Sequence, residues 1–198
     1  MRTVPENNKK ECLSERLENK TSHAQSTGKG WSIHISAKEQ WDGFKEYCNN
    51  ASLEIQRIYL ESELIKEECI SGKTYPGKMY IALPYCVREK DYEEIIKIVA
   101  YAKEHDYNGF LVRNIETIAF LKKMGYVGDI IADASVYVWN SGALMFWRER
   151  VTGITYPYEL NSREGFDLLK EDNCEKVLYG RLPMMITASA PPITRPMP

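Results

Sequence analysis

The stretch GFLVRNIETIAFLKKMGYVGDIIADAS, residues 109–135, decides the fold because it contains a complete strand–helix–strand unit. Its two ends, 109–114 and 129–135, are short aliphatic runs bounded by polar residues, which is typical of buried strands. Between them, residues 114–125 have apolar side chains at helical spacing, and Gly125 is suited to end a helix. The two strands should run parallel, because a parallel return needs a crossover helix.

The same alternation continues on both sides of this unit. Further strands are expected at 31–36, 57–62, 78–84, 153–157 and 176–180, and further helices at 90–105 and 161–172. About seven strands, with a helix in nearly every gap and no glycine-rich phosphate loop, favour an α/β fold of the TIM-barrel type over a Rossmann sheet. One of the usual eight strands is missing, so we expect an incomplete or open (β/α) barrel.

Composition divides the chain into three regions. Residues 1–30 are polar and charged, which predicts a flexible arm or linker. Residues 31–188 carry the apolar repeat and are expected to form the barrel domain. Residues 189–198 are proline-rich, which predicts an extended tail.

The bulk composition indicates a soluble globular protein of 198 residues, 43% hydrophobic and 27% charged. A net charge of −2 gives no reason to expect a polyanionic partner, so RNA binding is not supported by charge. No apolar run approaches the roughly 20 residues of a membrane helix, and no secretory leader is recognised. We therefore expect a cytoplasmic protein without a membrane partner.

Cysteine and histidine spacing predicts no metal site. The five cysteines are odd in number and scattered, without a C-x-x-C pair, so zinc-ribbon and thioredoxin signatures are absent. The three histidines share no helix face and no metal-ligand spacing. Among them, His34 is interpreted as a strand histidine whose hydrogen bonds are satisfied. The sequence identifies no cofactor.

Polar side chains concentrate where the expected strands end, whereas the strand bodies are almost wholly apolar. In a βα barrel the active site lies at the carboxyl ends of the strands, so this edge is the candidate site. The polar residues at these ends are Glu61, Tyr85, Cys86, Arg88, Arg113, Asn114, Asp133, Ser135, Tyr137, Asn140, Tyr156, Tyr158, Glu159, Asn161 and Arg181.

Local structural roles explain part of this list equally well. Capping of the helices that follow accounts for Asn114, Asn140 and Asn161 at least as well as ligand binding does. Cys86 is interpreted as an inert, half-buried thiol rather than a nucleophile.

Three arginines on one rim require compensation, because guanidinium groups repel one another. Asp133 and Glu159 would neutralise them in a structural ring of ion pairs, or an anionic ligand would bridge them; the two interpretations fit equally well. Gly180 would let the chain turn after the last strand, so that Arg181 points toward the mouth. The three arginines are Arg88, Arg113 and Arg181.

Four segments in order resemble the peptidase U32 family, the collagenase-like proteases and their relatives. They are LVRNIETIAFLKKMG (111–125), IIADASVYVWN (130–140), GITYPYELNSRE (153–164) and EKVLYGRLPMMIT (175–187). The resemblance covers most of residues 33–188 and implies a TIM-like barrel that hydrolyses peptide bonds.

The chain departs from that family's signature, which is E-x-F-x-x-G followed by a small residue, an aliphatic residue and a cysteine. Glu175, Gly180 and Leu182 match it, whereas Arg181 stands for the small residue and Pro183 for the cysteine. Relatives resemble RNA- and quinone-hydroxylating systems that hold an iron–sulfur cluster through four cysteines. This chain lacks that cysteine cassette.

The expected function is therefore that of a U32-type peptidase or a fragment of one. Glu159 is expected as the general base, aided by Asp133, with arginines stabilising the developing negative charge. The alternatives are a component of an RNA-hydroxylating relative and a catalytically silent, ligand-binding barrel fragment. The residues expected to bind a peptide or an anionic small-molecule substrate are Arg88, Arg113, Asn140, Asn161 and Arg181.

Overall fold

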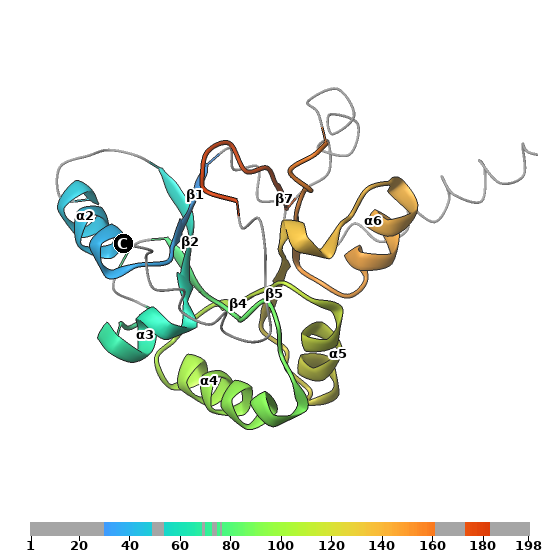
Figure 1. Ribbon diagram of the computed structural model, residues 1–198, viewed down its shortest axis with the longest axis horizontal. Helices are drawn as coiled ribbons and strands as arrows, with labels where there is room; N and C mark the ends of the chain where they lie inside the picture. Colours follow the sequence, from blue (N-terminus) through green and yellow to red (C-terminus); the bar gives the residue numbers. More distant parts are fainter. Residues whose placement is uncertain are drawn as a thin grey trace, which may run out of the picture.

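A curled parallel sheet forms the framework of the protein. The computed structural model describes residues 30–48, 54–68, 70–72, 75, 77–160 and 173–182. Within these ranges seven strands form one sheet in the order β1-β2-β3-β4-β5-β6-β7, with every neighbouring pair parallel. The sheet curves into a half barrel with helices on its outer side (Figure 1). The α/β class and the incomplete barrel-like repeat are therefore confirmed.

Strands and helices alternate along the chain. The strands are β1 (Trp31–Ile35), β2 (Ile55–Glu61), β3 (Lys78–Ala82), β4 (Gly109–Val112), β5 (Asp129–Ala132), β6 (Gly153–Thr155) and β7 (Cys174–Glu175). The α-helices are α2 (Lys38–Cys48), α3 (Ser62–Glu68), α4 (Tyr92–Glu104), α5 (Ile115–Lys123) and α6 (Ser141–Arg148). Two short 3₁₀ helices are η1 (Glu89–Asp91) and η2 (Ala134–Val136).

The β4–α5–β5 unit forms as the sequence predicts. Asn114 begins α5, and its side-chain oxygen accepts a hydrogen bond of 2.7 Å from the backbone of Thr117. Past the end of α5, Gly125 has a left-handed φ of 70°, which a residue without a side chain adopts at low cost. At the start of β4 a side chain on Gly109 would collide with the Asp129 backbone, so glycine permits the close pairing of the two strands.

Alternate strand residues face opposite sides of the sheet. The outward set, which includes Ile58, Leu60 and Ile81, packs in one large core against helix residues such as Ile98 and Leu121. The inward set is smaller, and its buried apolar members are Tyr59, Tyr80, Ala82, Leu111 and Ile131. The inner face therefore has a narrow apolar middle layer, and polar groups lie at both ends of it.

At the amino-terminal end of the sheet, a polar network joins the first and last strands. The Glu175 carboxylate accepts hydrogen bonds from Arg57 at 2.6 Å, from Ser32 at 2.6 Å and from the Tyr59 hydroxyl at 2.8 Å. Arg57 also donates to the Asn173 side chain at 3.3 Å. We call these five residues the basal network. It spans the gap between β1 and β7, where an eighth strand would close a full barrel.

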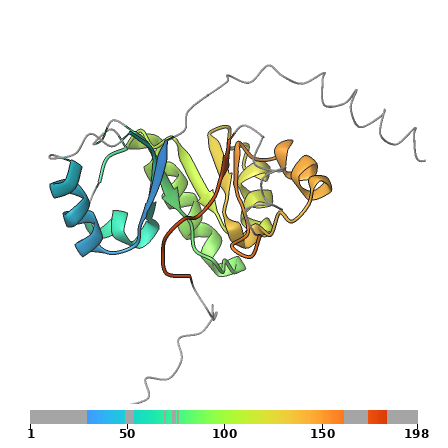
Figure 2. The ribbon, with the colours of Figure 1, turned by 90° about the horizontal axis from the view of Figure 1, so that it is seen from above.

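The last strand differs from its prediction at 176–180. The structure places β7 at Cys174–Glu175, and the chain then leaves the sheet (Figure 2). Leu178 is 71% exposed and Tyr179 is 99% exposed, so this apolar run is not a core strand. The pairing with β6 ends at Glu175, whose side chain belongs to the basal network. Gly180 has no left-handed φ, so the expected sharp turn does not depend on it.

Several predictions lie outside the described residues. They are the arm at 1–30 except for its last residue, the helix at 161–172, Asn161, Pro183 and the tail at 189–198.

Candidate active site at the carboxyl ends of the strands

Five side chains from different strands and strand ends meet at the carboxyl edge of the sheet. His34 lies in β1 and Glu61 ends β2, whereas Tyr85, Arg113 and Asp133 lie just past the ends of β3, β4 and β5. We call these five residues the mouth cluster. Their contacts show that parallel strands bring together groups that lie up to about a hundred residues apart in the chain.

Arg113 is the centre of the mouth cluster, with a side chain only 2% exposed. Its two terminal nitrogens donate to the two oxygens of Glu61, at 2.9 and 2.5 Å, in a bidentate ion pair. One of them also donates to the carbonyl of Leu83 at 3.1 Å. The Tyr85 ring covers the guanidinium at 4.0 Å, which is a cation–π contact. These contacts fix the orientation of Arg113.

The third nitrogen of Arg113 faces Asp133. Its Nε is buried and has no hydrogen-bond partner among the described residues, and the nearest Asp133 oxygen lies 3.9 Å away. That distance is an ion-pair contact but too long for a hydrogen bond. Ser135 holds Asp133 from the other side, because its hydroxyl lies 3.1 Å from the same carboxylate oxygen and 2.8 Å from the Arg113 carbonyl.

Glu61 links the arginine to a histidine. His34 Nε2 lies 2.9 Å from a Glu61 oxygen and 3.2 Å from the Arg113 guanidinium. Burial raises the pKa of Glu61, but hydrogen bonds and charge interactions with His34 and Arg113 outweigh burial and lower that pKa to about 2. Glu61 is therefore ionised at neutral pH. The His34 side chain is 41% exposed, so the carboxylate orients a ring that solvent still reaches.

The loop after β6 contributes to the electrostatics of the same edge. Burial and the nearby charge of Asp133 raise the pKa of the Tyr158 hydroxyl to about 12, with smaller effects of Tyr85 and Glu159. Tyr158 therefore remains a neutral hydrogen-bond donor across the physiological range. Glu159 follows it in an exposed turn.

The residues predicted from sequence separate into two groups. Arg113 and Asp133 join the mouth cluster, with Arg113 paired to Glu61 as well as to Asp133. Arg88 is exposed at the start of η1, and Arg181 is exposed in the segment after β7. Asn140 caps α6, since its side-chain oxygen accepts a 2.9 Å hydrogen bond from the backbone of Ala143. Capping is therefore its observed role.

Sequence reasoning misses the role of two members of the cluster. It predicts His34 as an ordinary strand histidine and Glu61 only as a polar strand end. A signal was available, because β1 and β2 are neighbours and both residues occupy inward positions near the ends of their strands. The contact with Arg113, 52 residues from Glu61, needed the curvature of the sheet.

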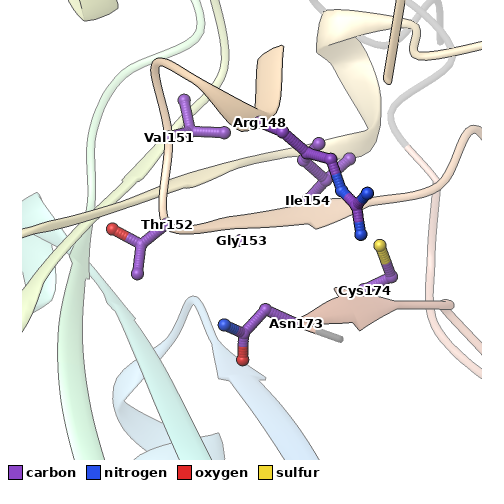
Figure 3. A pocket seen from close by; sticks show the side chains of 7 residues that line it. All are labelled: Arg148, Val151, Thr152, Gly153, Ile154, Asn173 and Cys174. Atoms are coloured by element: carbon purple, nitrogen blue, oxygen red, sulfur yellow. The ribbon is translucent and has the colours of Figure 1, made fainter. Parts of the chain in front are cut away.

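Two cavities lie away from the mouth cluster. A small one of about 20 Å³ sits at the amino-terminal side of β6 and β7, where the Arg148 guanidinium points toward the Cys174 sulfur (Figure 3). A larger one of about 380 Å³ lies on the outer side of the sheet, between α3 and α4. Neither is lined by a member of the mouth cluster.

Two further features are absent from the described ranges. No group of three or more His, Cys, Asp or Glu side chains in these ranges is arranged to hold a metal ion. No helix found there has the length and apolar character needed to cross a bilayer.

Comparison with known proteins found no matching protein family, no matching curated protein and no matching solved structure.

Proposed function

We propose that the chain is a hydrolase of the U32 peptidase type that cleaves peptide bonds at the mouth of its half barrel. The observation that carries the proposal is the 2.9 Å contact between His34 and Glu61, in which Arg113 fixes the carboxylate. A carboxylate-oriented histidine that solvent can reach is a general acid–base arrangement. The four segments that resemble the U32 family support a peptide as the substrate.

In the proposed reaction His34 acts as the general base. Neutral His34 donates its Nε2 hydrogen to Glu61, which leaves the lone pair of Nδ1 to accept a proton from water. The water oxygen then bonds to the peptide carbonyl carbon. When the carbon–nitrogen bond breaks, the imidazolium returns its proton to the leaving amine. Glu61 stays ionised throughout and stabilises the imidazolium, as its lowered pKa requires.

The remaining members of the mouth cluster position these groups. Arg113 and Tyr85 hold Glu61 and exclude water from behind it, and the Arg113 charge favours the negative charge that develops on the carbonyl oxygen. The neutral Tyr158 hydroxyl is a hydrogen-bond donor at the same edge. Asp133 is only 7% exposed and already contacts Ser135 and Arg113, which makes it the weaker candidate for proton transfer.

Glu159, the base expected from sequence, is the other candidate, and one experiment separates the two. The purified full chain is incubated with a mixed peptide library, and kcat/KM is measured for the best-cleaved peptide in the wild type, His34→Gln and Glu159→Gln. We expect His34→Gln to lower kcat/KM by about 100-fold or more, whereas Glu159→Gln stays within about threefold.

The opposite ranking would assign the base to Glu159 and overturn the role of His34. A folded wild-type chain that cleaves no peptide in the library would overturn the proposed function itself. Circular dichroism and unfolding by urea establish that each variant is folded.

A further inference from the structure

Two exposed aromatic rings stand on the same rim, outside the mouth cluster. Tyr137 is 56% exposed and Trp139 is 43% exposed, although large aromatic side chains are usually well buried. Their planes are parallel within 2°, and their centroids lie 6.5 Å apart. The Tyr92–Phe120 pair, by contrast, is a closed stack with its centroids 4.3 Å apart. At 6.5 Å the two rings are not in a closed stack, and their exposed parts are accessible to the ring of a ligand.

The backbone that carries these two rings is anchored on both sides. Val138 lies between them and is fully buried, which anchors the loop to the core. On one side Tyr137 is the C-cap of η2, and on the other Asn140 caps α6. Tyr137 itself has a left-handed backbone, with φ of 56°, a conformation that is uncommon for a bulky residue and often marks a functional site.

The loop also connects the rings to the mouth cluster. Tyr137 follows Asp133 by four residues, and η2 between them includes Ser135, whose hydroxyl contacts the Asp133 carboxylate. Because the loop leaves the carboxyl end of β5, the rings lie on the edge where the proposed reaction takes place.

The charge of this loop favours a neutral aromatic group over a nucleotide. Residues 134–147 contain no lysine, arginine, aspartate or glutamate. Asp133, directly before this stretch, is a buried carboxylate already paired with Arg113, so the loop supplies no cation for a phosphate. Single-stranded nucleic acids bind where aromatic rings are combined with a positively charged groove, and this loop supplies only the rings.

We propose that Tyr137 and Trp139 form an aromatic subsite that binds the side chain of an aromatic residue in a peptide substrate. The inference rests on the proposed function, because it assumes that the substrate is a peptide. It adds a preference that the hydrolytic groups alone do not supply: a peptide with phenylalanine or tyrosine near the cleaved bond binds better than one with an aliphatic side chain of equal size.

Ligand binding to the full chain tests the subsite without requiring catalysis. The probes are two capped tetrapeptides, Ala-Ala-Phe-Ala and its counterpart with cyclohexylalanine in place of phenylalanine, together with adenosine monophosphate. Binding is followed by NMR on the indole N–H signals, and the Trp139 signal is identified by its absence in Trp139→Leu. We expect the phenylalanine peptide to shift the Trp139 signal and to bind roughly threefold to tenfold more tightly than the cyclohexylalanine peptide.

Substitution of each ring tests whether the preference for phenylalanine depends on that ring. Tyr137→Asn removes one ring but keeps a residue that tolerates the left-handed backbone, and Trp139→Leu removes the other. Each variant should lose the preference for phenylalanine over cyclohexylalanine. Phe146→Leu is the matched control, because Phe146 is 51% exposed on α6 but its ring is covered by Arg150 at 3.8 Å. This control should retain the preference.

The outcomes distinguish failure of the subsite from failure of the proposed function. Equal binding of the two peptides, an unchanged preference in both subsite variants, or tighter binding of adenosine monophosphate than of the phenylalanine peptide would overturn the subsite. Ring-dependent binding of the phenylalanine peptide without any peptide cleavage would support the subsite and overturn the hydrolase. Cleavage with no difference between phenylalanine and cyclohexylalanine substrates would retain the hydrolase and overturn the subsite.

Discussion

The two ends of the barrel interior each contain an arginine–glutamate pair, and the pairs differ in what surrounds them. In the basal network both oxygens of Glu175 accept hydrogen bonds from Arg57, Ser32 or Tyr59. In the mouth cluster Glu61 is equally well satisfied, but it also orients a histidine that is 41% exposed. The Nε of Arg113 there has no hydrogen-bond partner among the described residues.

Under the proposed function, this difference separates a structural pair from a catalytic one. The basal network joins β1 and β2 to β7, so its charges connect the two edges of an incomplete barrel. The mouth cluster leaves a proton-accepting ring in contact with solvent, which stability alone does not require. Under the proposed function, the same residue types have different roles at the two ends, as in barrels whose strands carry the chemistry at their carboxyl ends and the stability at their amino ends.

The largest expected effect is the loss of stability in Arg113→Leu. This substitution leaves the carboxylates of Glu61 and Asp133 in a buried site without their cation. We expect the free energy of unfolding to fall by about 3–5 kcal/mol, measured by urea denaturation. The control is Arg88→Leu, which removes an exposed arginine and should change stability by no more than about 0.5 kcal/mol. Similar small changes in both variants would show that the mouth cluster does not contribute to the fold.

The second-largest expected effect is a loss of folding stability at acidic pH, caused by protonation of Glu61. The pKa of Glu61 is lowered to about 2 in the folded protein, so its stabilising effect is complete above its ordinary value of 4.5 and is lost as the pH falls toward 2. This difference corresponds to about 3 kcal/mol. Urea unfolding between pH 6 and pH 2 should show a shallower loss of stability in Glu61→Gln than in the wild type. Equal slopes would mean that Glu61 is not held ionised by its partners.

The sequence predicted the alternating strands and helices better than the side-chain contacts between different strands. The β4–α5–β5 unit was predicted because its apolar periodicity, its Asn114 cap and Gly125 are local signals. The last strand was misplaced because the apolar run at 176–180 suits a strand, whereas the pairing ends at Glu175. The polar character of the carboxyl edge was also predicted, but the His34–Glu61 contact depends on the neighbouring position of β1 and β2 and on Arg113.

The smallest expected effect tests whether Asn140 caps a helix or binds a ligand. Asn140→Ala should lower the free energy of unfolding by about 1 kcal/mol, because α6 loses its side-chain cap. Asn140→Ser retains a capping oxygen and should recover most of this loss. Peptide cleavage should have the same KM in both variants as in the wild type. A raised KM in Asn140→Ser despite restored stability would show that Asn140 contributes to substrate binding.

The most direct test of the account compares Glu61→Gln with Glu175→Gln in parallel. Both variants replace a carboxylate held by an arginine, so both should lose about 1.5–3 kcal/mol of stability. Only Glu61→Gln should lower kcat/KM for peptide cleavage, by about 100-fold or more. Equal losses of kcat/KM in the two folded variants, or a loss in Glu175→Gln alone, would contradict the assignment of chemistry to the mouth and structure to the base.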